Sequence, residues 1–183
     1  MISVTQVLSP FIDWSQISPE RLEHAGQRGT KIHAYNAAYL LGLWLPKIDA
    51  ECQGYFDSFR YFADARIDKV LFVEAEFICD CFQYIGHVDF VGVLKGEEGA
   101  SVIDWKSPLV MSPTWPSQIS AYCHLVEKHG RPPGNLKIKR CGALMLSPHG
   151  KTANFKEYTE SRLSEFNAFL AALNAYRWFK CNK

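Results

Sequence analysis

The chain has 183 residues, of which 48% are hydrophobic and 21% charged, and its formal net charge at pH 7 is +1. This length suits one domain over residues 1–183 with a substantial core, and no apolar run approaches the ~20 residues that a membrane-spanning helix needs. The first residues show none of the basic, apolar or arginine-rich patterns of a targeting peptide. We therefore expect a globular, soluble, cytoplasmic protein without a membrane segment.

Two helical segments are predicted in the N-terminal half. Ser18 is a plausible N-cap with Pro19 at the first helical position, and the helical pattern extends to Trp44, with Gly26 and Gly29 as possible breaks into two helices. A second segment, residues 49–66, repeats apolar residues at helical spacing.

The pattern then changes from helical to extended. Three successive strands are predicted, with the sequence KGEEGA as the turn between the last two. A helix, one or two further strands and a closing amphipathic helix complete the chain. This order predicts a mixed α/β architecture with a central sheet. The strands and helices of this part cover residues 69–82, 84–95, 100–107, 115–130, 136–148, 152–159 and 160–180.

The charges and cysteines carry weaker signals. Residues 1–91 hold 7 Lys and Arg against 12 Asp and Glu, whereas residues 92–183 hold 13 against 7. This asymmetry fits a polyanion track beside a cation-binding site, although it also arises by chance. The six cysteines form no C-x-x-C pair, and we expect reduced thiols. Cys79 and Cys81 can bind a soft metal from one strand face, but no second close pair completes a zinc site.

Two acids and a lysine interrupt the predicted central strands. Asp104 and Lys106 are two apart, so they share a strand face while Trp105 points to the other. Asp89 lies in the preceding strand, where its carboxylate can meet that of Asp104. Two convergent carboxylates repel each other unless a cation lies between them, and hard oxygen ligands suit Mg²⁺ or Mn²⁺. A lysine beside such a site can orient a water and stabilise charge on a phosphate; an ordinary Asp–Lys ion pair is the alternative.

Four short motifs together resemble the PD-(D/E)XK nuclease superfamily, in particular its exonuclease branch, which includes λ exonuclease. They read RGTKIH at 28–33, GHVD at 86–89, VIDWKS at 102–107 and QISAY at 118–122, in the order of the family. The resemblance implies a restriction-endonuclease-like core of the order αβββαβ, with a central mixed sheet flanked by helices. It also implies a stand-alone nuclease of phage or prophage type.

The resemblance assigns roles to the strand residues. Asp89 and Asp104 match the metal-binding acids, the backbone carbonyl of Trp105 matches a further ligand, and Lys106 matches the catalytic lysine. His33 matches an additional ligand of this branch, with an ordinary core histidine as the alternative.

Three further assignments follow from the same resemblance. Gln118 and Tyr122, four apart on one helix face, match a pair that contacts DNA or orders the site, with core packing of Tyr122 as the alternative. Either Glu74 or Glu76 matches the family's glutamate, and the spacing to Asp89 favours Glu74. Some relatives carry an iron–sulfur cluster on C-terminal cysteines; only Cys181 lies there, so no cluster is expected.

The implied function is a Mg²⁺- or Mn²⁺-dependent deoxyribonuclease, in particular an exonuclease that hydrolyses phosphodiester bonds in DNA recombination, repair or phage replication. Its partner would be single- or double-stranded DNA, with a second copy of the chain or a recombination protein as a further partner. Lys137 and Lys139 are predicted to contact the phosphates, with Arg162 and Arg177 as the next candidates. The alternatives are a non-catalytic nucleic-acid-binding or assembly subunit that keeps the fold, and a metal-dependent hydrolase acting on another substrate.

Overall fold

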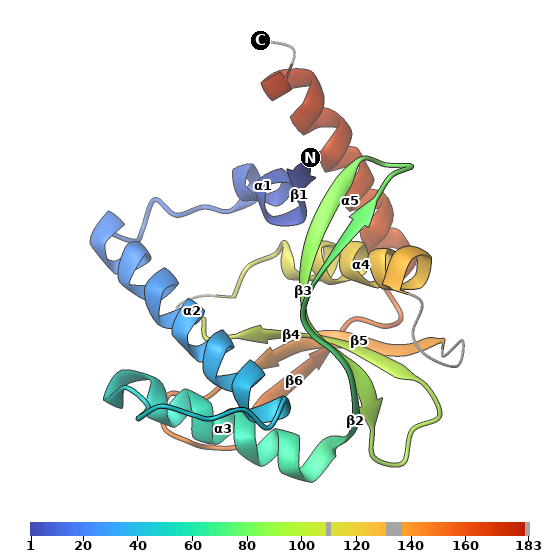
Figure 1. Cartoon of the computed structure of the whole chain (residues 1–183). Coiled ribbons are helices and arrows are strands. Elements are labelled where there is room, and N and C mark those ends of the chain that lie inside the picture. The colour runs from blue at the N-terminus through green and yellow to red at the C-terminus, as the bar shows by residue number, and fades with distance from the viewer. Residues whose placement is uncertain (109–110, 131–136, 182–183) are drawn as a thin grey trace.

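The computed structural model describes residues 1–108, 111–130 and 137–181, and its centre is a six-stranded sheet (Figure 1). The strands are β1 (Ile2–Ser3), β2 (Ile67–Cys79), β3 (Tyr84–Leu94), β4 (Ala100–Lys106), β5 (Ile138–Met145) and β6 (Asn154–Glu157). The α-helices are α1 (Val4–Leu8), α2 (Pro19–Leu40), α3 (Ala50–Arg66), α4 (Trp115–Leu125) and α5 (Arg162–Tyr176). Short 3-10 and π-helical turns extend three of them, namely η1 (Ser9–Phe11), η2 (Val126–Gly130) and η4 (Arg177–Cys181).

The sheet contains both parallel and antiparallel pairs. β2 and β3 form a long antiparallel hairpin, β3 is antiparallel to β4, and β5 is antiparallel to β6. β4 runs parallel to β5, and β1 runs parallel to the start of β3. The mixed α/β architecture that the change in periodicity predicts is therefore confirmed. The strand that corresponds to β5 was predicted to begin at Leu136, which lies outside the described residues.

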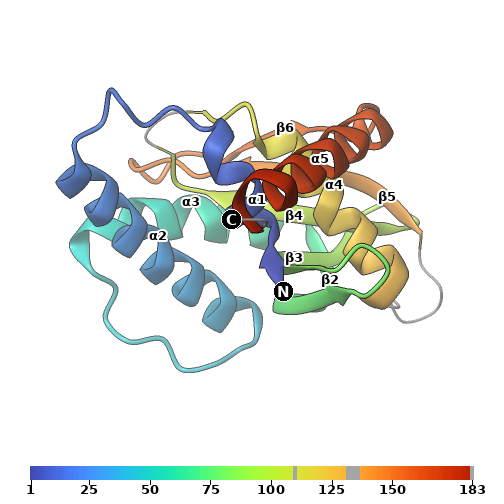
Figure 2. The same cartoon turned by 90° about the horizontal axis from the view of Figure 1, so that it is seen from above.

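Helices cover both faces of the sheet (Figures 1 and 2). α2 and α3 cover one face through a core that includes Ile32, Phe59 and Trp105. α1, α4 and α5 cover the other face through a core that includes Ile119 and Phe169. Within the described part of the chain, no helix combines the length and the apolar character needed to cross a membrane.

The N-terminal region differs in two places from what the sequence pattern indicates. α2 is one continuous helix through Gly26 and Gly29, because the cost of an interior glycine, about 1 kcal/mol relative to alanine, is small beside the packing of α2 on α3 and the sheet. The sequence pattern also predicts no element before Ser18. A five-residue helix such as α1 is too short to show a period, yet it buries Val4 and Val7 completely.

The β2–β3 hairpin changes faces at Glu74 and Asp89. Residues two apart in a regular strand share a face, but Val73 packs against the α2–α3 core and Ala75 against the opposite core. Glu74 has a φ of 48°, in the left-handed region that residues with side chains rarely adopt, and this conformation reverses the alternation. In β3, Val88 and Phe90 divide between the two cores in the same way.

β3 and β4 part at the same level of the sheet. Their ladder ends at Phe90 and Ile103, one residue before Asp89 and Asp104. Beyond this point β3 pairs with β2 and β1, whereas β4 pairs with β5 alone. The separation places the two acids at the point where the strands diverge.

Alanine at Gly26 and at Gly54 should have opposite effects on stability. A Cβ at Gly26 would meet no atom within 4 Å, so Gly26→Ala should raise the free energy of unfolding by about 0.5–1 kcal/mol. A Cβ at Gly54 in α3 would overlap the carbonyl oxygen of Pro148, so Gly54→Ala should lower it by about 1–3 kcal/mol. Urea denaturation measures both. A stabilised Gly54→Ala variant would contradict the packing of α3 against the loop between β5 and β6.

Candidate functional site

A cleft of about 500 Å³ opens where β3 and β4 part. Its walls come from α2, β2, β3, β4, α4 and the loop that precedes α2. Of the residues predicted to bind metal or take part in catalysis, Glu76 does not line it. Those that line it are His33, Glu74, Asp89, Asp104, Trp105, Lys106, Gln118 and Tyr122.

Three of the predicted ligands meet on one side of the cleft. His33 Nδ1 lies 3.1 Å from Glu74 Oε1 and 3.5 Å from Asp89 Oδ1. One ligand atom from each of the three residues lies within 4.8 Å of the other two. They come from α2, β2 and β3, so the contact joins a helix to both strands of the kinked hairpin. The group, called the His33–Glu74–Asp89 cluster below, is a candidate metal centre.

Asp89 also ties the two diverging strands together. Its Oδ2 accepts a hydrogen bond of 2.7 Å from the backbone N–H of Trp105. This N–H lies beyond the end of the β3–β4 ladder, so the carboxylate takes the place of a strand partner. Asp89 is only 5% exposed. Its other oxygen, Oδ1, is therefore a buried acceptor, and it faces His33.

Asp104 and Lys106 form a second polar group on the α4 side of the cleft. Lys106 Nζ lies 2.5 Å from Asp104 Oδ2 and donates to Gln118 Oε1 at 3.2 Å. Gln118 Nε2 donates to Asp104 Oδ1 at 3.3 Å and to the Tyr122 hydroxyl at 3.0 Å. The predicted helix face of Gln118 and Tyr122 is therefore found, and Tyr122 both packs in the core and bonds to Gln118.

Asp104 stands outside the His33–Glu74–Asp89 cluster. Its side chain shares a face with Lys106, as expected, and the two form an ion pair. This ion pair is the alternative to a catalytic role for Lys106, and the contact by itself is compatible with both.

The structure separates the two glutamates that sequence analysis left open. Glu74 contacts His33 and lines the cleft, whereas Glu76 is exposed and lies outside it. The prediction missed His87, whose Nε2 lies 3.0 Å from Glu74 Oε2. Its position two residues before Asp89 on a strand is the signal that points to this side of the hairpin.

The basic side chains expected along a DNA path do not border the cleft. Lys137 and Lys139 flank Ile138, which pairs with Ala100 at the start of β4. They therefore lie roughly 13 Å or more along the strands from Asp104. Arg162 pairs with Glu127 at 2.8 Å, and Arg177 donates to two backbone carbonyls. The DNA path proposed from the charge asymmetry is not supported by these positions.

Crowded charges shift the proton affinities of the cluster. Burial lowers the pKa of His33, but the Asp89 carboxylate and the hydrogen bond to Glu74 outweigh it and raise this pKa to about 9. Burial raises the pKa of Asp89 to about 8, with the carboxylates of Asp104 and Glu74 adding to the rise and His33 opposing it. Without a cation, the cluster therefore holds its protons more tightly than the same residues would in water.

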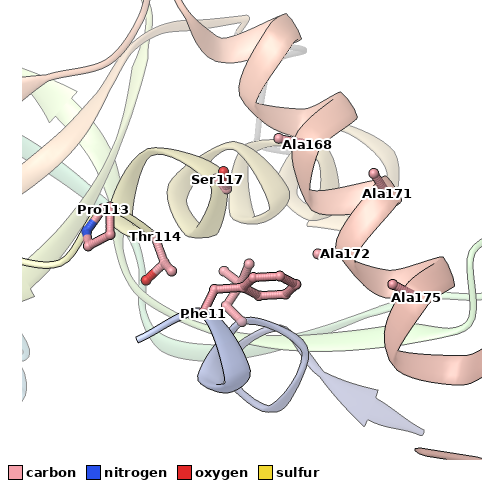
Figure 3. Close-up of a pocket in the computed structure, with 9 residues that line it drawn as sticks. Phe11, Pro113, Thr114, Ser117, Ala168, Ala171, Ala172 and Ala175 are labelled. Carbon is pink, nitrogen blue, oxygen red and sulfur yellow. The ribbon is translucent and has the colours of Figure 1, made fainter. Parts of the chain in front are cut away.

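A second hollow of similar volume has a different character (Figure 3). It lies between η1, the start of α4 and a row of alanines on α5. Phe11 reaches over it, and Thr114 and Ser117 supply the only polar side chains of its lining. None of these lining residues is titratable, so the hollow offers no acid, base or metal ligand.

Two sequence comparisons give no match. Scanning the chain against models of protein families finds none that fits it, and searching curated proteins finds no similar sequence. The function is therefore inferred from the cleft and its motifs.

The metal-free protein should lose stability as pH rises from about 6.5 to 9. The raised pKa of His33 stabilises the fold fully below its ordinary value of 6.5, and this contribution is lost as pH rises through about 9. The raised pKa of Asp89 acts in the same direction up to about pH 8. We expect the free energy of unfolding, measured in EDTA, to fall by about 1–3 kcal/mol over this range.

Two variants separate this effect from the general influence of pH. Asp89→Asn removes one of the shared protons and the charge that raises the pKa of His33, so its pH dependence should be flatter. Asp68→Asn removes an exposed carboxylate from β2 and should keep the wild-type slope. Equal slopes in the two variants would show that the cluster does not bind these protons.

Proposed function

We propose that this chain is a metal-dependent deoxyribonuclease of the PD-(D/E)XK type that acts as an exonuclease. The observation that carries the proposal is the convergence of His33, Glu74 and Asp89 beside Lys106 in one cleft. The order α3, β2, β3, β4, α4, β5 also fits the restriction-endonuclease-like core that the motif resemblance implies. Hydrolysis of DNA is the chemistry that this set of residues, in this order along the chain, supports best.

The cluster has the donor chemistry for a hard divalent cation. Glu74 and Asp89 would supply carboxylate oxygens and His33 its Nδ1, a set that suits Mn²⁺ and, through the oxygens, Mg²⁺. The backbone carbonyl of Trp105 and the carboxylate of Asp104 are further candidate ligands. The proton shared by His33 and its carboxylates has to leave before the nitrogen can coordinate an ion. When bound, such a cation lowers the pKa of water and neutralises charge on a phosphate.

Lys106 is positioned to act on the phosphate and on the attacking water. Its ammonium group is held by Asp104 and Gln118 and lies 5.5 Å from the centre of the Trp115 ring. Fixed donors contribute most where negative charge develops during a reaction. In hydrolysis the water oxygen forms a bond to phosphorus, the bond to the leaving oxygen breaks, and that oxygen is protonated. Lys106 would orient the water and stabilise the charge on the phosphate oxygens.

The mouth of the cleft offers an aromatic contact for DNA. Trp14, in the loop before α2, lines the cleft and is 41% exposed. An exposed indole can stack on an unpaired base, and such stacking is tolerant of sequence. This supports a DNA substrate with an unpaired end, which is where an exonuclease acts.

Digestion of matched linear and circular DNA tests the proposal. The wild-type chain should degrade linear DNA in Mn²⁺ or Mg²⁺ but not in EDTA, and it should leave covalently closed circles intact. Asp89→Asn should be inactive in every condition. Intact linear DNA after incubation of the folded wild-type chain with either metal would contradict the proposal and favour a non-catalytic binding or assembly subunit. Cleavage of the circle would correct the exonuclease assignment to an endonuclease.

Lys106→Met should lower the rate of DNA hydrolysis by about 10²–10³-fold, because a fixed donor to the developing charge is lost. Lys128→Met, which changes an exposed lysine outside the cleft, should keep the wild-type rate. Lys106→Met leaves the buried carboxylate of Asp104 without its ion-pair partner, so circular dichroism should check that this variant folds. Lys106→Gln provides a second variant, whose side chain can still donate a hydrogen bond to Asp104. Near wild-type rates in both Lys106 variants would exclude the lysine from catalysis.

A further inference from the structure

A pair of cysteines lies at the turn of the β2–β3 hairpin, away from the cleft. Cys79 ends β2, Cys81 lies in the turn, and their sulfur atoms are 3.3 Å apart. Cys79 is fully buried, whereas Cys81 is exposed. Neither residue lines the cleft. The pair therefore joins one thiol that a solute can reach to a second thiol directly behind it.

Contacts from outside and within the turn hold it in place. Arg177 Nη2, from η4, donates to the carbonyl oxygens of Phe82 at 2.6 Å and Gln83 at 2.8 Å. The side chain of Gln83 donates to the carbonyl oxygen of Asp80 at 2.5 Å. These bonds fix the turn on both sides of Cys81 and keep the two sulfurs at hydrogen-bonding distance, without a covalent bond between them.

The backbone of the turn also points donors at the buried sulfur. Burial raises the pKa of Cys79 and the Cys81 thiol adds to the rise, while the backbone N–H groups of Phe82 and Cys81 oppose it. Hydrogen bonds of this kind stabilise negative charge on a sulfur atom. Because the net pKa of Cys79 is raised, the buried thiol keeps its proton until the neighbouring Cys81 sulfur has been oxidised.

We propose that Cys79 and Cys81 form a reversible redox site whose substrate is a hydroperoxide. The Cys81 thiol gives up its proton, its sulfur attacks a peroxide oxygen, and the O–O bond breaks. Cys81 becomes a sulfenic acid, and the leaving oxygen takes up the proton and is released as water or an alcohol. Cys79 then attacks the Cys81 sulfur, and hydroxide leaves with the Cys79 proton as water. The two thiols lose two electrons and the peroxide gains them. The distance between the two sulfurs falls from 3.3 Å to about 2.05 Å in the disulfide. A dithiol reduces this disulfide and restores the two thiols.

The other cysteines provide an internal comparison. Cys52, Cys123 and Cys141 are each 0% exposed, so a solute has no direct access to them. Of the five cysteines whose side chains are described, Cys81 alone is exposed. An exposed thiol beside a resolving thiol is the arrangement in which a sulfenic acid is converted to a disulfide before further oxidation.

Peptide mapping tests the proposal because trypsin separates the cysteines. Residues 70–95 contain Cys79 and Cys81 and no Lys or Arg before Lys95, while Cys52, Cys123 and Cys141 fall in residues 48–60, 107–128 and 141–151. The reduced, folded chain would be treated with equimolar hydrogen peroxide, denatured, alkylated and digested. We expect peptide 70–95 to carry no alkyl group on either cysteine and to have the mass of the reduced peptide minus two hydrogen atoms. Reduction with dithiothreitol before alkylation should restore alkylation of both cysteines. The other three peptides should stay fully alkylated.

Two variants divide the roles of the thiols. Cys79→Ser should let the Cys81 sulfenic acid accumulate, where dimedone traps it. Cys81→Ser, at an exposed position, should leave Cys79 alkylated after the same treatment. Two alkylated cysteines in wild-type peptide 70–95, or a disulfide between two chains through Cys81, would overturn the proposal. Cys81→Ser decides the matter even if Cys79→Ser fails to fold.

Discussion

The hydrogen bond from the Trp105 backbone N–H to Asp89 Oδ2 holds the two central strands at the point where they part. A buried backbone donor left without a partner would destabilise the fold by roughly 1–3 kcal/mol, so strands in a core rarely separate without a substitute acceptor. Here a carboxylate is the acceptor, and its other oxygen faces His33. The same residue thus closes the gap in the sheet and supplies the charge around which the cleft is built.

The kink at Glu74 brings the second acid to the same point. Its left-handed backbone is an unfavourable conformation, and conformations of this kind cluster at functional sites. Glu74 is held by His33 on one side and His87 on the other, so two imidazoles offset the repulsion between it and Asp89. Lys106 does the same for Asp104. Each carboxylate in the cleft therefore has a cationic or polar partner. In the proposed nuclease a divalent cation would take the place of the proton on His33.

Local rules predict much of this arrangement from the sequence. Alternation along β4 places Asp104 and Lys106 on one face, and helical spacing joins Gln118 to Tyr122. The preference for Glu74 over Glu76 came from the motif resemblance, through the family's usual spacing to Asp89. The rest depends on how elements meet, which no local pattern records. The end of the β3–β4 ladder directs Asp104 to Lys106 and leaves Asp89 with His33. The register of β5 against β4 places Lys137 and Lys139 at the far end of the strands. The proposed function comes from the motif resemblance, and the cleft provides side chains with which that chemistry is physically reasonable.

Titration of the metal-free chain with Mn²⁺ in a calorimeter tests the central claim most directly, because it asks whether the cluster binds a cation at all. The wild-type chain should bind Mn²⁺, and Asp89→Asn and Glu74→Gln should each abolish the binding. Glu76→Gln, which changes the exposed glutamate on the same strand, should retain wild-type affinity. Mn²⁺ binding of equal affinity in the wild-type and Asp89→Asn chains would contradict the assignment of His33, Glu74 and Asp89 as the metal centre.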